Sequence, residues 1–153
     1  MSTTNLITDE IRAWIGRADE PVRFEVTRRD IIKYSQATGQ RNEKFLRGDE
    51  APPMFLFGVE RPLVAIGDLG PDGLAHDALL PELPLKRVMA GGVKQLYHRP
   101  IVPGDVLLLT RRISDIYEKR GSTGALIFVV YELTVTTEGG ALVMQQTQSR
   151  INR

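Results

Sequence analysis

The chain has 153 residues, of which 42% are hydrophobic, so it can bury one adequate core and is short for two domains. Twenty basic and nineteen acidic side chains leave a net charge of +1, which excludes a general electrostatic field for nucleic acid or an anionic membrane. No cysteine is present, so disulfides, thiolate nucleophiles and cysteine-ligated metals are excluded. We expect one domain over residues 1–153, with no nucleic-acid or membrane partner.

A cytoplasmic location is expected from two further features of the sequence. The first ten residues lack the charged start and apolar run of an export signal. No stretch approaches the roughly 18 apolar residues of a membrane span.

The first third of the chain predicts two helices separated by a strand. Residues 6–16 carry apolar side chains at helical spacing, and residues 24–26 alternate like a strand. Thr27 followed by Asp30 resembles a capping box, so a helix is predicted from residue 28 to about 38, closed by Gly39.

Residues 46–85 are the least regular part, because six prolines and several glycines interrupt them. Pro52 and Pro53 forbid a regular helix through that point. We predict one short buried helix within residues 54–66, followed by a long loop that packs on the domain.

Four long strands are predicted after residue 86: 87–97, 105–118, 125–137 and 141–151. Turn signals separate them, and their order indicates an antiparallel meander. In the third strand, one face is apolar throughout and predicts a buried surface. The opposite face begins apolar and also needs cover, which a second sheet would provide; its first residues are Leu126, Phe128 and Val130.

One segment resembles a catalytic signature without its catalytic side chains. Tyr34-Ser-Gln-Ala-Thr-Gly-Gln-Arg-Asn-Glu-Lys-Phe45 is similar to the Y-x-x-A-x-G-D-x-N-P-x-H signature of the MaoC-like (R)-specific enoyl-CoA hydratases. In that family, the Asp and His activate the water that adds to the substrate double bond. Gln40 and Phe45 occupy those two positions here, and neither side chain can take a proton from water near neutral pH.

Three further motifs carry the same resemblance, to the N-terminal, fatty-acid-synthase-type dehydratase domains of the MaoC-like family. Residues 97–105 and 113–121 look like the family's Y-H-R-P-x-x-x-G-D and D-x-x-x-K-x-G patterns, and residues 51–55 match A-P-P-x-F. Together with the strand pattern, the resemblance implies an α+β hotdog fold, in which a long antiparallel β-sheet wraps around a central α-helix.

The resemblance also implies a division of labour between two hotdog units. A complete unit supplies Asp and His, while a degenerate unit shapes the acyl-CoA tunnel. The expected function is therefore that of a hydratase or dehydratase subunit, which binds an acyl-CoA or acyl-carrier thioester and forms a homodimer or a heterodimer with a catalytic MaoC-like chain. Coenzyme A thioester is expected as substrate or ligand, with no other cofactor and no metal. Two alternatives remain: a non-catalytic homodimer that binds acyl-CoA or fatty acyl groups, and an active homodimer with a relocated acid or base.

Several residues are candidates for such a site, and each also has a structural interpretation. His98 is a candidate base or a brace for a turn, and Glu43 is a relocated acid or base or half of a solvated pair. Asn42 matches the family Asn. Gly91 and Gly92 bring a backbone N–H close to the thioester or form a β-bulge. Basic side chains form either a phosphate site or a charged strand edge; they include Lys94, Arg111 and Arg112.

Overall fold

The protein is an antiparallel sheet of five strands with short helices at its two ends. The structure is a computed structural model and describes residues 5–153. Its elements are, in chain order, α1 (Asp9–Arg12), β1 (Val22–Glu25), α2 (Arg28–Ala37), α3 (Glu43–Leu46), the 3-10 helix η1 (Ile66–Asp68), β2 (Val88–Tyr97), β3 (Val106–Gly121), β4 (Gly124–Thr137) and β5 (Leu142–Asn152).

The four predicted long strands are present within a few residues of their expected ends, but they do not form a simple meander. The order across the sheet is β1-β3-β4-β5-β2. Tight turns that contain glycines at positive φ, Gly124 and Gly140, join β3 to β4 and β4 to β5. Residues 98–105 instead carry the chain from β2 at one edge across to β3, so β2 pairs with β5.

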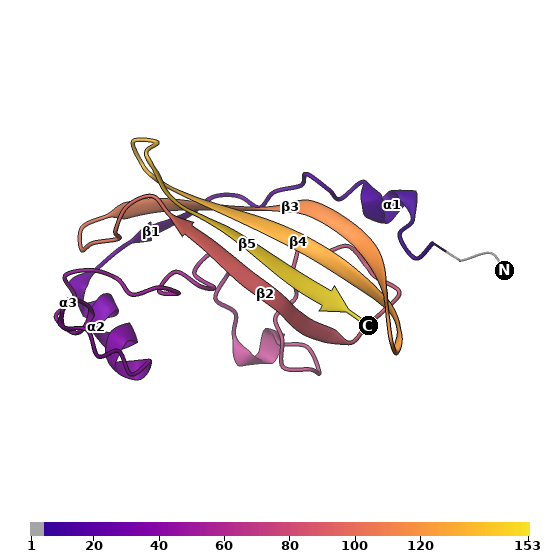
Figure 1. Cartoon of the computed structure of the whole chain (residues 1–153), viewed down its shortest axis with the longest axis horizontal. Helices are drawn as coiled ribbons and strands as arrows, with labels where there is room; N and C mark the ends of the chain where they lie inside the picture. The colour runs from indigo at the N-terminus through magenta and orange to yellow at the C-terminus, as the bar shows by residue number, and fades with distance from the viewer. Residues whose placement is uncertain (1–4) are drawn as a thin grey trace.

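The predicted helix over residues 28–38 is confirmed as α2, and its start has the predicted cap. The Thr27 side chain accepts a hydrogen bond from the backbone N–H of Asp30 at 3.1 Å. The N-terminal helix is shorter than predicted, since α1 is a single turn capped by Thr8. Figure 1 shows α2 and α3 at one end of the sheet and α1 at the other.

The prediction of a helix within residues 54–66 is wrong. Turns occupy residues 53–60, and Met54 has a φ of 70°, which a helix does not tolerate. The physical reasons are that Pro53 and Pro62 interrupt a helix and that Gly58 also has a positive φ. The burial of this segment is nevertheless confirmed, because Phe55 and Leu56 are 7% and 0% exposed.

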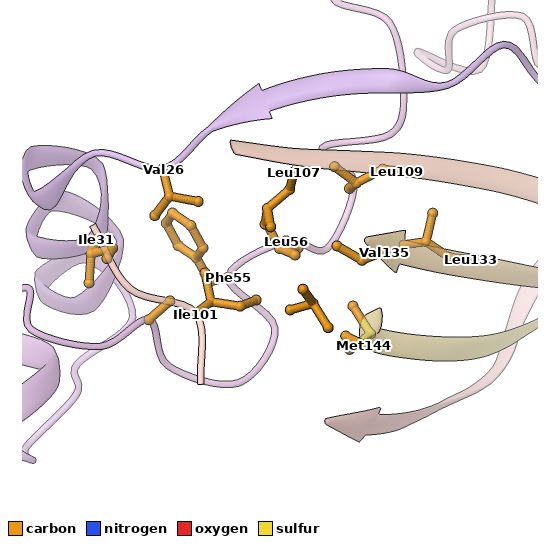
Figure 2. Close-up of a cluster of buried hydrophobic side chains, with 12 residues drawn as sticks. Val26, Ile31, Phe55, Leu56, Ile101, Leu107, Leu109, Leu133, Val135 and Met144 are labelled. Atoms are coloured by element: carbon orange, nitrogen blue, oxygen red, sulfur yellow. The ribbon is translucent and has the colours of Figure 1, made fainter. Parts of the chain in front are cut away.

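The inner face of the sheet carries two separate hydrophobic clusters. The first joins α2 and residues 51–56 to the α2 end of the sheet, as Figure 2 shows; its members include Val26, Ile31, Phe55, Leu56, Leu107, Leu109, Leu133, Val135 and Met144. The second packs α1 and residues 79–85 on the other end, and includes Ile7, Ile11, Leu79, Leu83, Ile113, Ile127, Val129 and Tyr131. The predicted apolar face of β4 thus contributes to both clusters.

Arg111 of β3 lies between the two clusters and is only 6% exposed. Its Nε donates to Asp19 at 2.8 Å, and its two terminal nitrogens donate to Asp77 at 3.0 and 2.7 Å. These bonds fasten the segment before β1 and the loop before β2 to the middle of the sheet. Burial favours a raised pKa for Asp77, but the hydrogen bonds and charge of Arg111 outweigh it and leave the pKa of Asp77 below its usual value.

We predict that Arg111→Ala destabilises the protein by about 3 kcal/mol, because it leaves two partly buried carboxylates without their cation. Urea unfolding at pH 7 measures the loss. Arg112→Ala is the matched control: Arg112 lies next in sequence and pairs with Glu132 at the surface, so its removal should cost at most about 1 kcal/mol. Equal losses from the two variants would contradict the structural role of Arg111.

The same interaction predicts an acid-sensitive stability. The pKa of Asp77 is lower in the folded than in the unfolded chain, so the folded state binds fewer protons. The stabilisation is therefore fully present above the pKa of Asp77 in the unfolded chain, about 3.9. It is lost as the pH falls through the lower pKa of Asp77 in the folded chain. Unfolding free energies measured from pH 6 downward should show this loss in the parent chain and a weaker one in Arg111→Ala.

Candidate functional site

Three of the sequence motifs line one cavity of about 400 Å³, which we call the motif cavity. Residues from the end of the first signature and the following Ala-Pro-Pro segment form one side: Lys44, Phe45, Glu50, Ala51 and Pro53. The Y-H-R-P motif forms the other side with Tyr97, His98, Arg99, Pro100 and Ile101. The motifs are about 50 residues apart in sequence and meet because β2 ends against the α3 segment.

The position of the family His is an apolar wall of this cavity. Phe45 is half-buried, and the Lys44 ammonium lies 5.0 Å from the centre of its ring. The same ammonium pairs with Glu50 at 3.1 Å. Gln40 lies outside the lining, and its side-chain amide donates to the Thr38 hydroxyl at 3.4 Å. Neither signature position therefore offers a base.

The first turn of α3 contains two of the candidate site residues, Asn42 and Glu43. The Asn42 side chain caps this helix by accepting from the backbone N–H of Lys44 at 3.2 Å. Glu43 is the first residue of the helix, is exposed, and does not line the motif cavity. A carboxylate in the first turn of a helix is favoured there by the helix dipole.

His98 lines the cavity and also braces the end of β2. Its Nε2 lies 2.9 Å from Oε1 of Gln145, and its backbone N–H donates to the Val143 carbonyl at 2.9 Å. The bracing interpretation of His98 thus has direct partners.

Tyr97 is a cavity residue that sequence reasoning did not select, although it opens the Y-H-R-P motif. Burial raises the pKa of its phenol, a backbone hydrogen bond from Met54 partly offsets this, and Tyr34 raises it further. The hydroxyl is therefore neutral at pH 7 and available as a hydrogen-bond donor. Met54 is the one non-glycine residue at positive φ within residues 5–153, so backbone strain accompanies this contact.

Gly91 and Gly92 form a β-bulge on β2, which was the structural alternative for them. The register with β5 shifts between Ala90 and Gly92, and Gly92 has a φ of 124°. A Cβ at Gly91 would lie 2.8 Å from that of Ser149, so close strand packing explains this glycine. Neither glycine lines the motif cavity, and neither does Lys94, which is exposed on the same strand.

The two arginines proposed for phosphates already have carboxylate partners. Arg111 is buried with Asp19 and Asp77, and Arg112 donates from Nε to Glu132 at 3.0 Å. Both lie on β3, outside the motif cavity. A phosphate at either guanidinium would have to compete with these carboxylates.

Within residues 5–153, no three His, Asp or Glu side chains gather closely enough to hold a metal ion. No helix in the same range is both long and apolar enough to cross a membrane.

Known structures with the same fold come from dehydratases and hydratases. A C-terminally truncated HadBC (3R-hydroxyacyl-ACP dehydratase) complex from Mycobacterium tuberculosis matches with a TM-score of 0.63 and 16% identity, over 91% of this chain and 97% of that one. The R-hydratase PhaJ1 from Pseudomonas aeruginosa matches with a TM-score of 0.59 and 18% identity, over 90% of this chain and 81% of that one. The MaoC-like dehydratase from Rhodospirillum rubrum matches with a TM-score of 0.55 and 15% identity, over 90% of this chain and 91% of that one.

At these identities the likeness shows the fold, and it confirms the predicted hotdog class. No curated protein sequence matches the chain significantly. The family model of the FAS1-like dehydratase domain region matches residues 13–146. Because this match spans most of the 153 residues, the chain belongs to the family of FAS1-like, dehydratase domain regions.

Proposed function

We propose that the protein is a MaoC-like enoyl-CoA hydratase or 3-hydroxyacyl dehydratase subunit that binds an acyl thioester and works with a catalytically complete partner chain. One observation carries the proposal: the family motifs meet at one cavity, yet the acid and base positions of the signature hold Gln40, outside the lining, and Phe45, in the wall. The cavity therefore lacks the two proton-transfer groups of the family signature.

The reaction is the reversible syn addition of water to a trans-2-enoyl thioester. The Asp and His of the partner take a proton from water, the resulting hydroxyl bonds to C3, and a proton is delivered to C2. This chain contributes binding and orientation, through an apolar wall at Phe45 and Ile101 and a donor at the Tyr97 hydroxyl.

The free edge of β2 supports a partner. β2 is the last strand of the sheet, so within residues 5–153 one row of its backbone hydrogen-bonding groups has no strand beside it. It also carries exposed apolar side chains: Val88, Met89, Val93, Leu96 and Tyr97. The outer face of β4, which we expected to need cover, is already half-buried. The ring of Phe128 stacks there on that of Tyr117, with 4.9 Å between the ring centres. The edge of β2 is therefore the better candidate for the partner surface. The related HadBC protein is also a complex.

The isolated chain is predicted to be a poor hydratase. Loss of one acid or base typically removes about 10²- to 10⁴-fold of rate, and both groups are absent here. Hydration of crotonyl-CoA should be slow with the pure chain and rise when a MaoC-like chain with an intact D-x-N-P-x-H signature is added.

A gain-of-function variant tests the same assignment. Gln40→Asp combined with Phe45→His should produce measurable hydration by the chain alone. The control combines Gln36→Asp with Phe45→His, because Gln36 is exposed on α2, and it should stay inactive. Rapid hydration by the unaltered chain would sink the degenerate-subunit proposal and favour an active homodimer with a relocated base.

Association through β2 is predicted to be measurable by size-exclusion chromatography with light scattering. The chain should elute as at least a dimer of its 17.1 kDa mass, alone or with its partner. Leu96→Asp, at a side chain 56% exposed on β2, should weaken the association. Leu63→Asp, fully exposed outside the strands, is the control. A stable monomer at micromolar concentration, with and without the partner, is the contrary result.

Thioester binding is predicted to have an apolar and an electrostatic component. Titration calorimetry with acyl-CoAs of increasing length should show affinity rising by up to about 0.8 kcal/mol per buried CH₂ and falling in high salt. Tyr97→Phe should weaken binding, whereas Tyr117→Phe, on the outer face, should not. Absence of binding by both the chain and its complex would leave only a structural role.

A further inference from the structure

Two arginines face each other on the outer face of the sheet, opposite the side that holds the two hydrophobic clusters. Arg87 precedes β2 and Arg153 follows β5, and their backbones exchange two hydrogen bonds, of 3.0 and 2.8 Å. Residues paired in this way lie directly across the strands from each other, with Cα atoms about 5.5 Å apart. Figure 1 shows the start of β2 and the end of β5 at the end of the sheet where β3 turns into β4.

This pair places like charges in register. Both side chains are exposed, and neither guanidinium forms an ion pair within residues 5–153. Elsewhere the sheet places opposite charges in register, since Arg112 pairs with Glu132 directly across β3 and β4. Like charges directly opposite each other destabilise a sheet, so an anion held by both arginines would offset their repulsion.

A third cation continues the row across the sheet. Lys119 of β3 lies opposite Leu126 of β4. Because β4 pairs with β5 up to Asn152, Leu126 and Arg153 are the next residues in register. Neighbouring strands are about 4.8 Å apart, so the backbone of Lys119 is roughly 10 Å from that of Arg153. We call Arg87, Arg153 and Lys119 the cationic row.

An apolar row lies beside the cationic row on the same face, two residues further along each strand. Its pairs in register are Met89 with Ile151, Ile151 with Phe128, and Phe128 with Tyr117. The Lys119 ammonium lies 5.4 Å from the ring centres of both Tyr117 and Phe128. This cation–π contact holds the third cation beside the apolar row.

The acidic side chains near these rows do not neutralise the cations. Asp115 lies on the outer face one row further along β3, so the apolar row separates it from the cationic row. Glu118 lies on the inner face and accepts a backbone hydrogen bond from the N-terminal segment at 3.1 Å. Glu82 pairs with Lys86 in the loop before β2. The cationic row and Arg120 outnumber Asp115 even when a backbone carboxylate at residue 153 is counted, so this face favours an anion.

We propose that this face binds a small organic phosphate, with the phosphate between the guanidinium groups of Arg87 and Arg153 and the apolar body of the ligand along the apolar row. A phosphate monoester carries a charge of about −1.5 to −2 near pH 7, which matches two guanidinium groups. Guanidinium groups also bind phosphate oxygens through paired hydrogen bonds.

The proposal is independent of the function assigned to the motif cavity. Arg87 and Tyr97 lie at opposite ends of β2, and no residue of either row lines the motif cavity. The proposal concerns binding and adds no chemical step.

Phenyl phosphate, inorganic phosphate and phenol are matched probes for this site. Inorganic phosphate lacks the apolar body, and phenol lacks the charge. Titrations of the full chain, followed by amide ¹H–¹⁵N NMR, should give an affinity for phenyl phosphate about tenfold higher than for either of the others. The shifts should map to Met89, Phe128 and Arg153. Binding of phenol or inorganic phosphate as tight as that of phenyl phosphate, shifts elsewhere, or no saturable binding would overturn the proposal.

Arginine variants separate a built site from a general effect of charge. Arg87→Gln and Arg153→Gln should each lower the affinity for phenyl phosphate about tenfold. Arg153→Lys keeps the charge but loses the paired hydrogen bonds, so its affinity should fall between those of Arg153→Gln and the parent chain. Arg29→Gln is the control: Arg29 is exposed on α2 and forms no ion pair within residues 5–153. An equal loss in Arg29→Gln would show that binding follows net charge alone and would overturn the proposal.

Thermal melts with and without phenyl phosphate provide the second readout. Without ligand, Arg87→Gln should keep or raise Tm, because it removes one of two like charges in register. With ligand, the Tm of the parent chain should rise and that of Arg87→Gln should change less. A lower Tm together with an unchanged affinity would show that Arg87 has a structural role instead.

Discussion

The buried interaction of Arg111 with Asp19 and Asp77 organises the inner side of this sheet. A guanidinium in such a place is costly to bury unless carboxylates meet it, and here both come from segments outside the four long strands. The interaction therefore positions the loop before β2 and the segment before β1 on the sheet. It also interrupts the apolar surface, with Leu109 in one cluster and Ile113 in the other.

The register that holds Arg111 continues across the sheet with one apolar and two polar side chains. In register with Arg111 lie Leu133, then Gln146, then Gln95, and the two glutamines hydrogen-bond at 2.8 Å. The motif cavity is at the α2 side of this row, where the apolar cluster supports Phe55 and Ile101. A second cavity, of about 290 Å³, is at the row itself, where Arg111 forms part of its wall. The buried cation thus lines one cavity and lies outside the other.

The proposed function rests on a cavity whose walls belong to family motifs, while Gln40 and Phe45 hold the two proton-transfer positions of the signature. Cavity walls depend on backbone path and apolar volume, and these survive in the Ala-Pro-Pro segment and the Y-H-R-P segment. Proton transfer depends on single side chains, and Gln40 and Phe45 cannot perform it. A second chain is the simplest source of the missing groups, and the exposed apolar edge of β2 is a surface on which it can pair.

The sequence alone determined the four long strands, the start of α2 and the residues at the two signature positions. Alternation identified the buried face of β4, Thr27 and Asp30 marked the start of α2, and the motif comparison identified Gln40 and Phe45. Strand order, the turns at residues 53–60 and the partners of Arg111 were decided only by tertiary structure. Strand alternation is a local property, whereas β2 pairs with β5 through contacts some 50 residues apart. The sequence cannot distinguish an arginine that binds phosphate from one that pairs with buried carboxylates. Asp19 and Asp77 are far from Arg111 in sequence and contact it only in the folded chain.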